Sequence, residues 1–249
     1  MIRNLVLVFC VALSCPALGS QGEAPLVNDP PKGVSIPNII QSFAAKEKEF
    51  KQAREQYTYT QDVTVRASCR GGQPGVYHLI VDVTFDGRGN QLERVKGADS
   101  TLQCIAISKE DLDGFRDQSL LLLTTDQIQD YHINFVGQQQ QDNMHFYVFD
   151  VAPVTVLPGK QYFEGRIWVD SRDFQILKSH GTITTRREKK RKGQENLFPA
   201  VTTWREQIDG RYWFPTYSRA NDVLHFSSGD VQIDEVVKLT NYKAIGHSK

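Results

Sequence analysis

The residue types that most often carry out chemistry are present in this chain, but they are scattered. Six histidines occur without forming an HExxH or HxH pair: His78, His132, His145, His180, His225 and His247. Zinc enzymes hold their metal with such closely spaced pairs. The GxSxG elbow of hydrolases and the phosphate-binding P-loop are also missing, and the segment 87–89 (GRG) has the composition of a turn. The sequence therefore predicts no catalytic residues, no metal site and no cofactor, so that the protein is not an enzyme.

Cysteine is the second residue type with possible chemistry. Cys10 and Cys15 lie near the N-terminus, and Cys69 and Cys104 lie in the body of the chain, without any CxxC motif. In an exported protein, the last two favour a disulfide. A loop of this length, closed by such a bond, would be stabilised by roughly 3–4 kcal/mol. Two free buried thiols are the alternative.

The densest charge in the chain is a basic run at residues 186–193. It contains six cations: Arg186, Arg187, Lys189, Lys190, Arg191 and Lys192. One interpretation is an exposed hairpin loop, and the other is a patch that contacts anionic headgroups or an acidic partner. The formal net charge of the whole chain is zero, so nothing in its overall charge favours a nucleic-acid partner.

The N-terminus is typical of a secretory signal. Arg3 is followed by a continuous apolar run at 5–13, and small residues at 17 and 19 would permit cleavage before Ser20. We therefore assign residues 1–19 to a signal peptide. An uncleaved anchor, or a lipoprotein cut before Cys15, are the alternatives. The next residues, 20–35, are rich in proline and glycine and are expected to form a flexible lead-in.

Residues 162–183 have the pattern of a β-hairpin, around which the rest of the chain is organised. Two runs of aromatic and β-branched residues flank the polar turn at 170–173. Alternation places Phe163, Gly165, Ile167 and Val169 on one face, which we expect to be the core face, and leaves a mixed face that points outward.

The rest of the chain repeats this pattern after one helix. Apolar residues at helical spacing predict a helix over about 37–54, and further strands of period two follow from residue 57 to 243. Two short helices are expected within 108–129. The predicted fold class is α+β: about ten antiparallel strands in a strongly curved sheet, covered on its concave side by the helices. Residues 36–249 would form a single domain.

A bent sheet with so few helices leaves apolar side chains that could hold an apolar ligand. We expect the helix and the hairpin to line this space. The candidate cavity residues are Ile39, Ile40, Phe43 and Phe50 on the helix, and Phe163, Ile167 and Val169 on the strand.

Several stretches together resemble a known family. They are residues 59–61 (YTQ), 163–178 (FEGRIWVDSRDFQILK), 196–199 (NLFP), 204–217 (WREQIDGRYWFPTY) and 224–226 (LHF). With the exported amphipathic helix, they are similar to the LolA/LolB-like outer-membrane lipoprotein-sorting superfamily, which includes the N-terminal domain of the regulator RseB. The similarity extends over about residues 36–243.

This resemblance implies a half-open antiparallel barrel whose cavity accepts acyl chains of lipids or lipoproteins. It also implies a location in the periplasm, or at the periphery of the outer membrane, of a Gram-negative bacterium. The arginine-proline pair of the carrier's second strand has no clear counterpart; Arg88 and Arg94 lie nearby without a following proline. An RseB-like sensor that binds an envelope protein partner is the alternative function.

Overall fold

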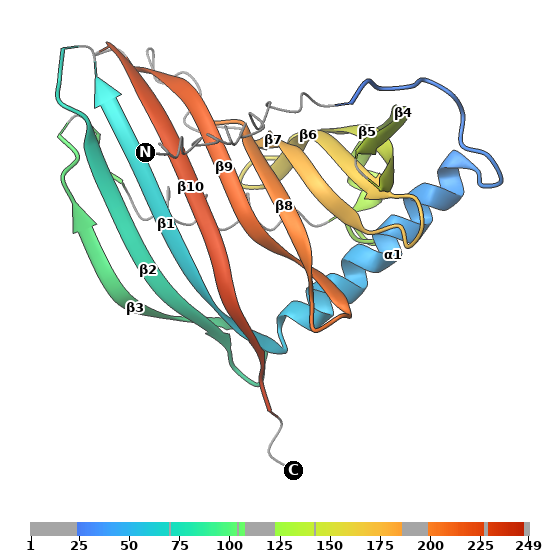
Figure 1. Cartoon of the computed structure of the whole chain (residues 1–249), viewed down its shortest axis with the longest axis horizontal. Coiled ribbons are helices and arrows are strands. Elements are labelled where there is room, and N and C mark those ends of the chain that lie inside the picture. Colours follow the sequence, from blue (N-terminus) through green and yellow to red (C-terminus); the bar gives the residue numbers. More distant parts are fainter. Residues whose placement is uncertain are drawn as a thin grey trace, which may run out of the picture.

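The computed structural model describes residues 24–69, 71–103, 105–107, 123–141, 143–185, 199–226 and 229–246. These residues form one antiparallel sheet of ten strands and one α-helix, α1 (Ile36–Arg54) (Figure 1). The prediction of an α+β chain with about ten antiparallel strands is therefore confirmed. The strands are β1 (Tyr57–Cys69), β2 (Gly75–Phe85), β3 (Gln91–Ser100), β4 (Tyr131–Gln141), β5 (Met144–Pro153), β6 (Gln161–Asp170), β7 (Ile176–Thr185), β8 (Val201–Ile208), β9 (Tyr212–Phe226) and β10 (Gly229–Ala244).

Two meanders build the sheet, whose strand order is β3-β2-β1-β10-β9-β8-β7-β6-β5-β4. The first comprises β1 to β3 and the second β4 to β10, and they are joined where β1 pairs with β10. The sheet is open, because β3 and β4 at its two ends do not pair with each other. The first and last strands of the chain thus lie side by side in its interior.

Helix α1 begins as its sequence predicts. The Ser35 hydroxyl accepts a hydrogen bond from the Asn38 backbone N–H at 3.3 Å, a proline lies in the first turn, and Lys51 and Arg54 lie in the last turn. Its buried stripe contains Glu47 among apolar residues. The full stripe is Ile39, Phe43, Ala44, Glu47, Phe50 and Ala53. Residues 108–122, where one short helix was expected, lie outside the described residues, and the second expectation corresponds to a turn and the 3-10 helix η1 (Ile128–Asp130).

Helix α1 packs on one face of the sheet, which we call the helix face. Directly paired residues of neighbouring strands point to the same face. The pairing can be followed from β6 to β2 through Ile167, Ser179, Thr203, Ser218, Val237, Val63 and Leu79. Along β1, burial alternates strictly from Tyr57 to Ala67, as a strand with one apolar face requires.

The predicted hairpin is confirmed as β6 and β7, joined by a turn in which the Phe174 N–H donates to the Asp170 carbonyl at 3.0 Å. Its outward face differs from the expectation, because Trp168 is buried in a second small apolar cluster on the opposite face of the sheet. The other members of that cluster are Phe146, Val148 and Leu177. Both faces of β6 are therefore packed.

The lead-in before α1 lies along the edge strand β4. Val27 and Gln138 exchange both backbone hydrogen bonds, at 2.8 and 2.7 Å. The side-chain amide of Gln139 donates to the Ala24 carbonyl and accepts from the Trp168 indole, each at 2.5 Å. These contacts attach the segment to the sheet edge and satisfy the buried indole N–H of Trp168.

Candidate functional site

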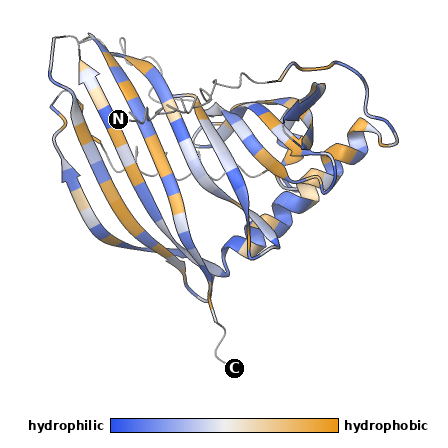
Figure 2. Cartoon of the chain, viewed as in Figure 1, coloured by the Kyte–Doolittle hydropathy of each residue, from blue (hydrophilic) through white to orange (hydrophobic). Residues whose placement is uncertain are grey.

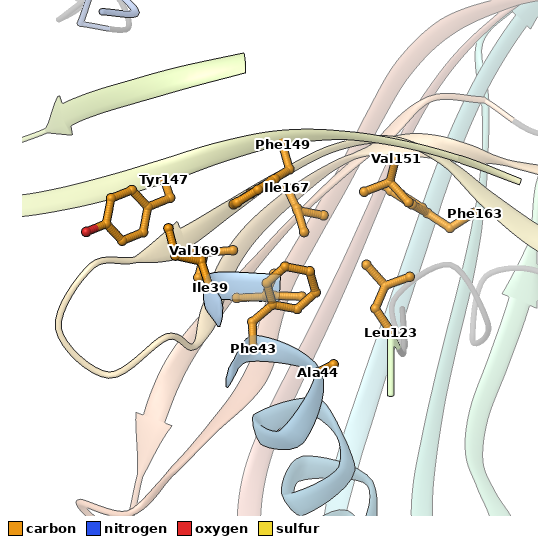
Figure 3. Close-up of a cluster of buried hydrophobic side chains, with 11 residues drawn as sticks. Ile39, Phe43, Ala44, Leu123, Tyr147, Phe149, Val151, Phe163, Ile167 and Val169 are labelled. Carbon is orange, nitrogen blue, oxygen red and sulfur yellow. The ribbon is translucent and has the colours of Figure 1, made fainter. Parts of the chain in front are cut away.

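The predicted cavity residues meet in the structure between α1 and the strands. Five of the seven belong to one cluster of buried side chains, which we call the helix cluster (Figure 3). Phe43 of the helix packs edge-on against Phe149 of β5, with 5.8 Å between ring centroids. The members are Ile39, Phe43, Ala44, Leu123, Tyr147, Phe149, Val151, Phe163, Ile167, Val169 and Ile176. Their mutual contacts form a layer of packed apolar side chains.

The other two predicted residues lie at its margins. Ile40 is partly buried and packs against the helix cluster. Phe50 lies one turn further along α1, where it meets Phe214 of β9 at 5.6 Å between centroids, in a separate cluster with Ala53 and Tyr57. Helix α1 therefore packs across the sheet from β5 to β9 and reaches the first residue of β1.

An ion pair fixes this helix to the sheet. Arg205 of β8 donates two hydrogen bonds to the carboxylate of Glu47, at 2.5 and 3.1 Å, and both side chains are at most 4% exposed. The Arg205 guanidinium also lies over the Phe50 ring, 4.6 Å from its centroid. A bidentate arginine–carboxylate pair fixes both distance and orientation, so it sets where α1 lies on the helix face.

The part of the helix face farthest from α1 carries a second apolar surface, which we call the β1–β2–β10 patch. It contains Tyr59, Val63, Val65, Leu79, Val81, Val83, Phe85, Val237 and Leu239. Apolar and polar residues alternate along these strands (Figure 2). A helix of 19 residues is about 28 Å long, whereas ten strands span about 43 Å. In the part of the chain that the structure describes, no helix lies over this patch.

A carboxyl group lies on the same face, next to the patch. Glu235 of β10 is 2% exposed, and its Oε2 atom has no hydrogen-bond partner. Burial raises the pKa of this carboxyl from 4.5 to about 8. At neutral pH the folded protein therefore holds Glu235 mostly in its neutral form.

The opposite face of the sheet has an open hollow of about 760 Å³ over β4 to β8. Its charged side chains are largely paired with one another: Arg166 binds Asp150 at 2.7 and 3.1 Å, and Lys178 lies 4.3 Å from the centroid of the Trp168 ring. Such self-neutralised charges give the hollow no strong preference for one sign of ligand.

The histidines lie apart from one another in the fold. His78 binds Asp62 at 2.9 Å, His180 binds Thr202 at 2.8 Å and His225 binds Asp230 at 2.7 Å. Among the described residues, no group of three or more His, Cys, Asp or Glu side chains could hold a metal ion. None of the described helices is long and apolar enough to cross a membrane.

Some predicted sites fall outside the described residues. The six cations Arg186, Arg187, Lys189, Lys190, Arg191 and Lys192 are among them, so the anionic-surface patch stays a prediction. Cys69 is disulfide-bonded, but Cys104 is not described. The Cys69–Cys104 pairing therefore also stays a prediction.

We expect the exported protein to contain no free thiol at either of these positions. Titration with a thiol reagent in denaturant without reductant should find none, and after reduction it should find two. A Cys104→Ser variant should then expose one thiol, that of Cys69. Two reactive thiols in the unreduced wild-type protein would show that the bond does not form.

Comparison with known proteins finds no matching family model and no matching curated protein. Among solved structures, the chain is similar to a LolA superfamily protein from Nitrosomonas europaea, with 16% identity, 82% of this chain and 94% of that chain covered, and a TM-score of 0.38. A DUF1329 family protein from Desulfovibrio piger matches with 15% identity, coverage of 84% and 95%, and a TM-score of 0.41. A putative outer membrane lipoprotein-sorting protein domain from Vibrio parahaemolyticus matches with 11% identity, coverage of 83% and 94%, and a TM-score of 0.35. The superfamily that the sequence resembles is thus represented among the matches. At these identities and TM-scores the matches carry no argument about function.

Proposed function

We propose that this protein is an exported, non-enzymatic binder or carrier of the acyl chains of lipids or lipoproteins. The chains would lie against the helix face of the sheet, which would wrap around them as a half-open barrel. The β1–β2–β10 patch is the observation that supports this proposal. It offers an apolar surface away from α1, and each methylene that a ligand buries on such a surface contributes about 0.8 kcal/mol.

The helix cluster would form one wall of this site. Ile39, Phe43, Ile167 and Val169 are fully buried, and they pack against one another. A ligand would not need to displace them if it lay beside the cluster, on the patch. In this arrangement the seven predicted cavity residues border the acyl site from the side of α1, and the patch forms its floor.

The remaining parts of the proposal concern location. Residues 1–19 would direct the chain out of the cytoplasm into the envelope of a Gram-negative bacterium, and the basic run 186–193 would contact anionic headgroups there. Each cation near an anionic membrane contributes about 1 kcal/mol. Such a contact would bring the acyl site close to the surface that supplies its ligand.

Two neighbouring residues of β2 provide a matched test. Leu79 belongs to the β1–β2–β10 patch, whereas Ile80 points to the opposite face and is half-buried. We expect Leu79→Asn to weaken the binding of a fluorescent fatty acid about ten-fold or more, because it places an amide under the acyl chain. Ile80→Asn should change the affinity less than two-fold. Fluorescence titration of purified protein measures both.

The stability of both variants must be measured beside their affinity. If Leu79→Asn and Ile80→Asn weaken binding equally, the ligand does not lie on the patch. If the wild-type protein binds no acyl probe, and organic extracts of protein purified from its native envelope contain no lipid, the proposed function is wrong.

An envelope protein partner, as for an RseB-like sensor, is the second candidate. The open edge of the sheet supports it: β3 is exposed along nearly its whole length, including the apolar side chains of Leu92 and Val95. Partner segments can add a strand to such an edge. However, the charges of Glu93, Arg94 and Lys96 on this strand are typical of edges that avoid pairing, so we place this function second.

A further inference from the structure

Glu235 occupies the middle of the helix face. It lies on β10, where its direct neighbours are Val65 of β1 and Ala220 of β9. Ile233 and Val237, two residues away in each direction, point to the same face and are buried. The carboxyl group therefore extends from an interior strand, between the β1–β2–β10 patch and the strands that lead towards α1.

The fold gives this carboxyl no partner. Among the described residues, Glu47 is buried against Arg205, and the Asp170 carboxylate accepts hydrogen bonds from the backbone N–H groups of Arg172 and Asp173. Glu235 is buried just as deeply, but no hydrogen bond to its Oε2 atom is formed. Leaving a buried polar group unpaired is unfavourable, so folding alone does not explain a carboxyl at this position.

The surface beside Glu235 is unusually low. The row of paired residues that runs from it towards β6 contains small side chains: Ala220, Val201, Gly181 and Gly165. A Cβ atom at Gly165 would lie 2.2 Å from the His180 carbonyl oxygen, so no larger residue fits there. The next row is also small and polar, with Ser218 and Thr203 joined by a hydrogen bond of 2.9 Å. A group that lies on these rows approaches the Glu235 carboxyl closely.

We propose that Glu235 binds the polar end of an amphiphile whose head group is uncharged, such as an alcohol or a primary amide, while the apolar chain lies on the β1–β2–β10 patch. This inference rests on the proposed function and specifies its ligand. A neutral carboxyl offers one O–H donor and a carbonyl acceptor, which match a hydroxyl or an amide. The floor of small residues leaves room for the head group beside the carboxyl.

Two other kinds of head group fit less well. An ammonium head would require an ionised Glu235, and the desolvation of both charges opposes a buried ion pair. A carboxylate head would have to take up a proton before it could bind beside a carboxyl group. The single unpaired carboxyl among apolar and small side chains therefore favours the uncharged head.

Paired ligands test this inference. Dodecanol and dodecane have the same chain and differ in the hydroxyl, and their affinities can be measured by displacement of the apolar dye N-phenyl-1-naphthylamine. We expect Glu235→Leu to weaken dodecanol about ten-fold relative to its effect on dodecane, which corresponds to one buried hydrogen bond. Glu235→Gln should keep dodecanol within about three-fold of wild type, because the amide also donates and accepts.

A control variant and a second readout complete the test. Asp234→Leu makes the same kind of change at the adjacent residue, which is partly exposed and bound to Arg219 at 3.1 Å on the opposite face. It should leave both affinities unchanged. The carboxylic C=O band of Glu235 in the infrared spectrum, identified by its loss in Glu235→Gln, should shift when dodecanol binds.

The outcomes separate this inference from the proposed function. If wild-type protein binds both chains, and Glu235→Leu affects them equally or not at all, Glu235 does not bind the head group and the acyl-binding function remains. If neither chain displaces the dye from any of the folded proteins, the acyl-binding function itself fails. A selective loss of dodecanol in Glu235→Leu alone supports the inference.

Discussion

Replacement of Arg205 by methionine should lower the free energy of unfolding by about 3–5 kcal/mol. The change leaves the Glu47 carboxylate fully buried opposite an apolar side chain, without the two hydrogen bonds that the guanidinium donates. It also removes the cation over the Phe50 ring. Urea denaturation followed by circular dichroism measures the loss.

The double variant Glu47→Leu/Arg205→Met distinguishes a cost of unpaired charge from a cost of lost packing. It should recover most of the wild-type stability, because apolar residues of similar size often replace a buried ion pair without loss. Lys46 and Glu49 on the same helix provide the control, as they form an exposed pair at 2.9 Å. Lys46→Met should cost less than about 1 kcal/mol. A double variant as unstable as Arg205→Met would show that packing, and not charge, accounts for the effect.

The sequence was sufficient to predict the elements and most of their buried faces. Helical spacing placed Ile39, Phe43 and Phe50 on the buried stripe, and period two placed Phe163, Ile167 and Val169 on the helix face. These patterns are local, and each is repeated over several turns or pleats, so they survive small errors of register. The helix α1 and the hairpin of β6 and β7 were therefore found close to their observed bounds.

The buried charges could not be assigned in the same way. Glu47 lies in a run of charged residues, and its partner Arg205 is 158 residues away, so only the tertiary pairing reveals their contact. The same is true of the junction between β1 and β10, which joins the two meanders. Glu235 did leave a signal, because it occupies an inward position of an alternating strand, between Ile233 and Val237. Its lack of a partner is visible only in the folded chain.

The final prediction concerns the dependence of stability on pH. The pKa of Glu235 is about 8 in the folded protein and 4.5 without burial. Between these values the folded state holds a proton that the unfolded state has released, so stability falls as pH rises, by about 1.4 kcal/mol per pH unit. Below pH 4.5 both states are protonated and nothing is lost, whereas above pH 8 both are ionised and the loss is complete. The total is about 5 kcal/mol.

Urea denaturation of the wild type and of Glu235→Gln at pH 5, 6, 7 and 8 isolates this contribution. Glutamine is neutral throughout, and every other titrating group, including Asp170 with its raised pKa, is common to both proteins and cancels in the difference. We expect the wild type to lose about 4 kcal/mol relative to the variant between pH 5 and 8. Parallel curves would mean that the Glu235 carboxyl titrates normally in the folded protein, and therefore that it is hydrated or paired in solution.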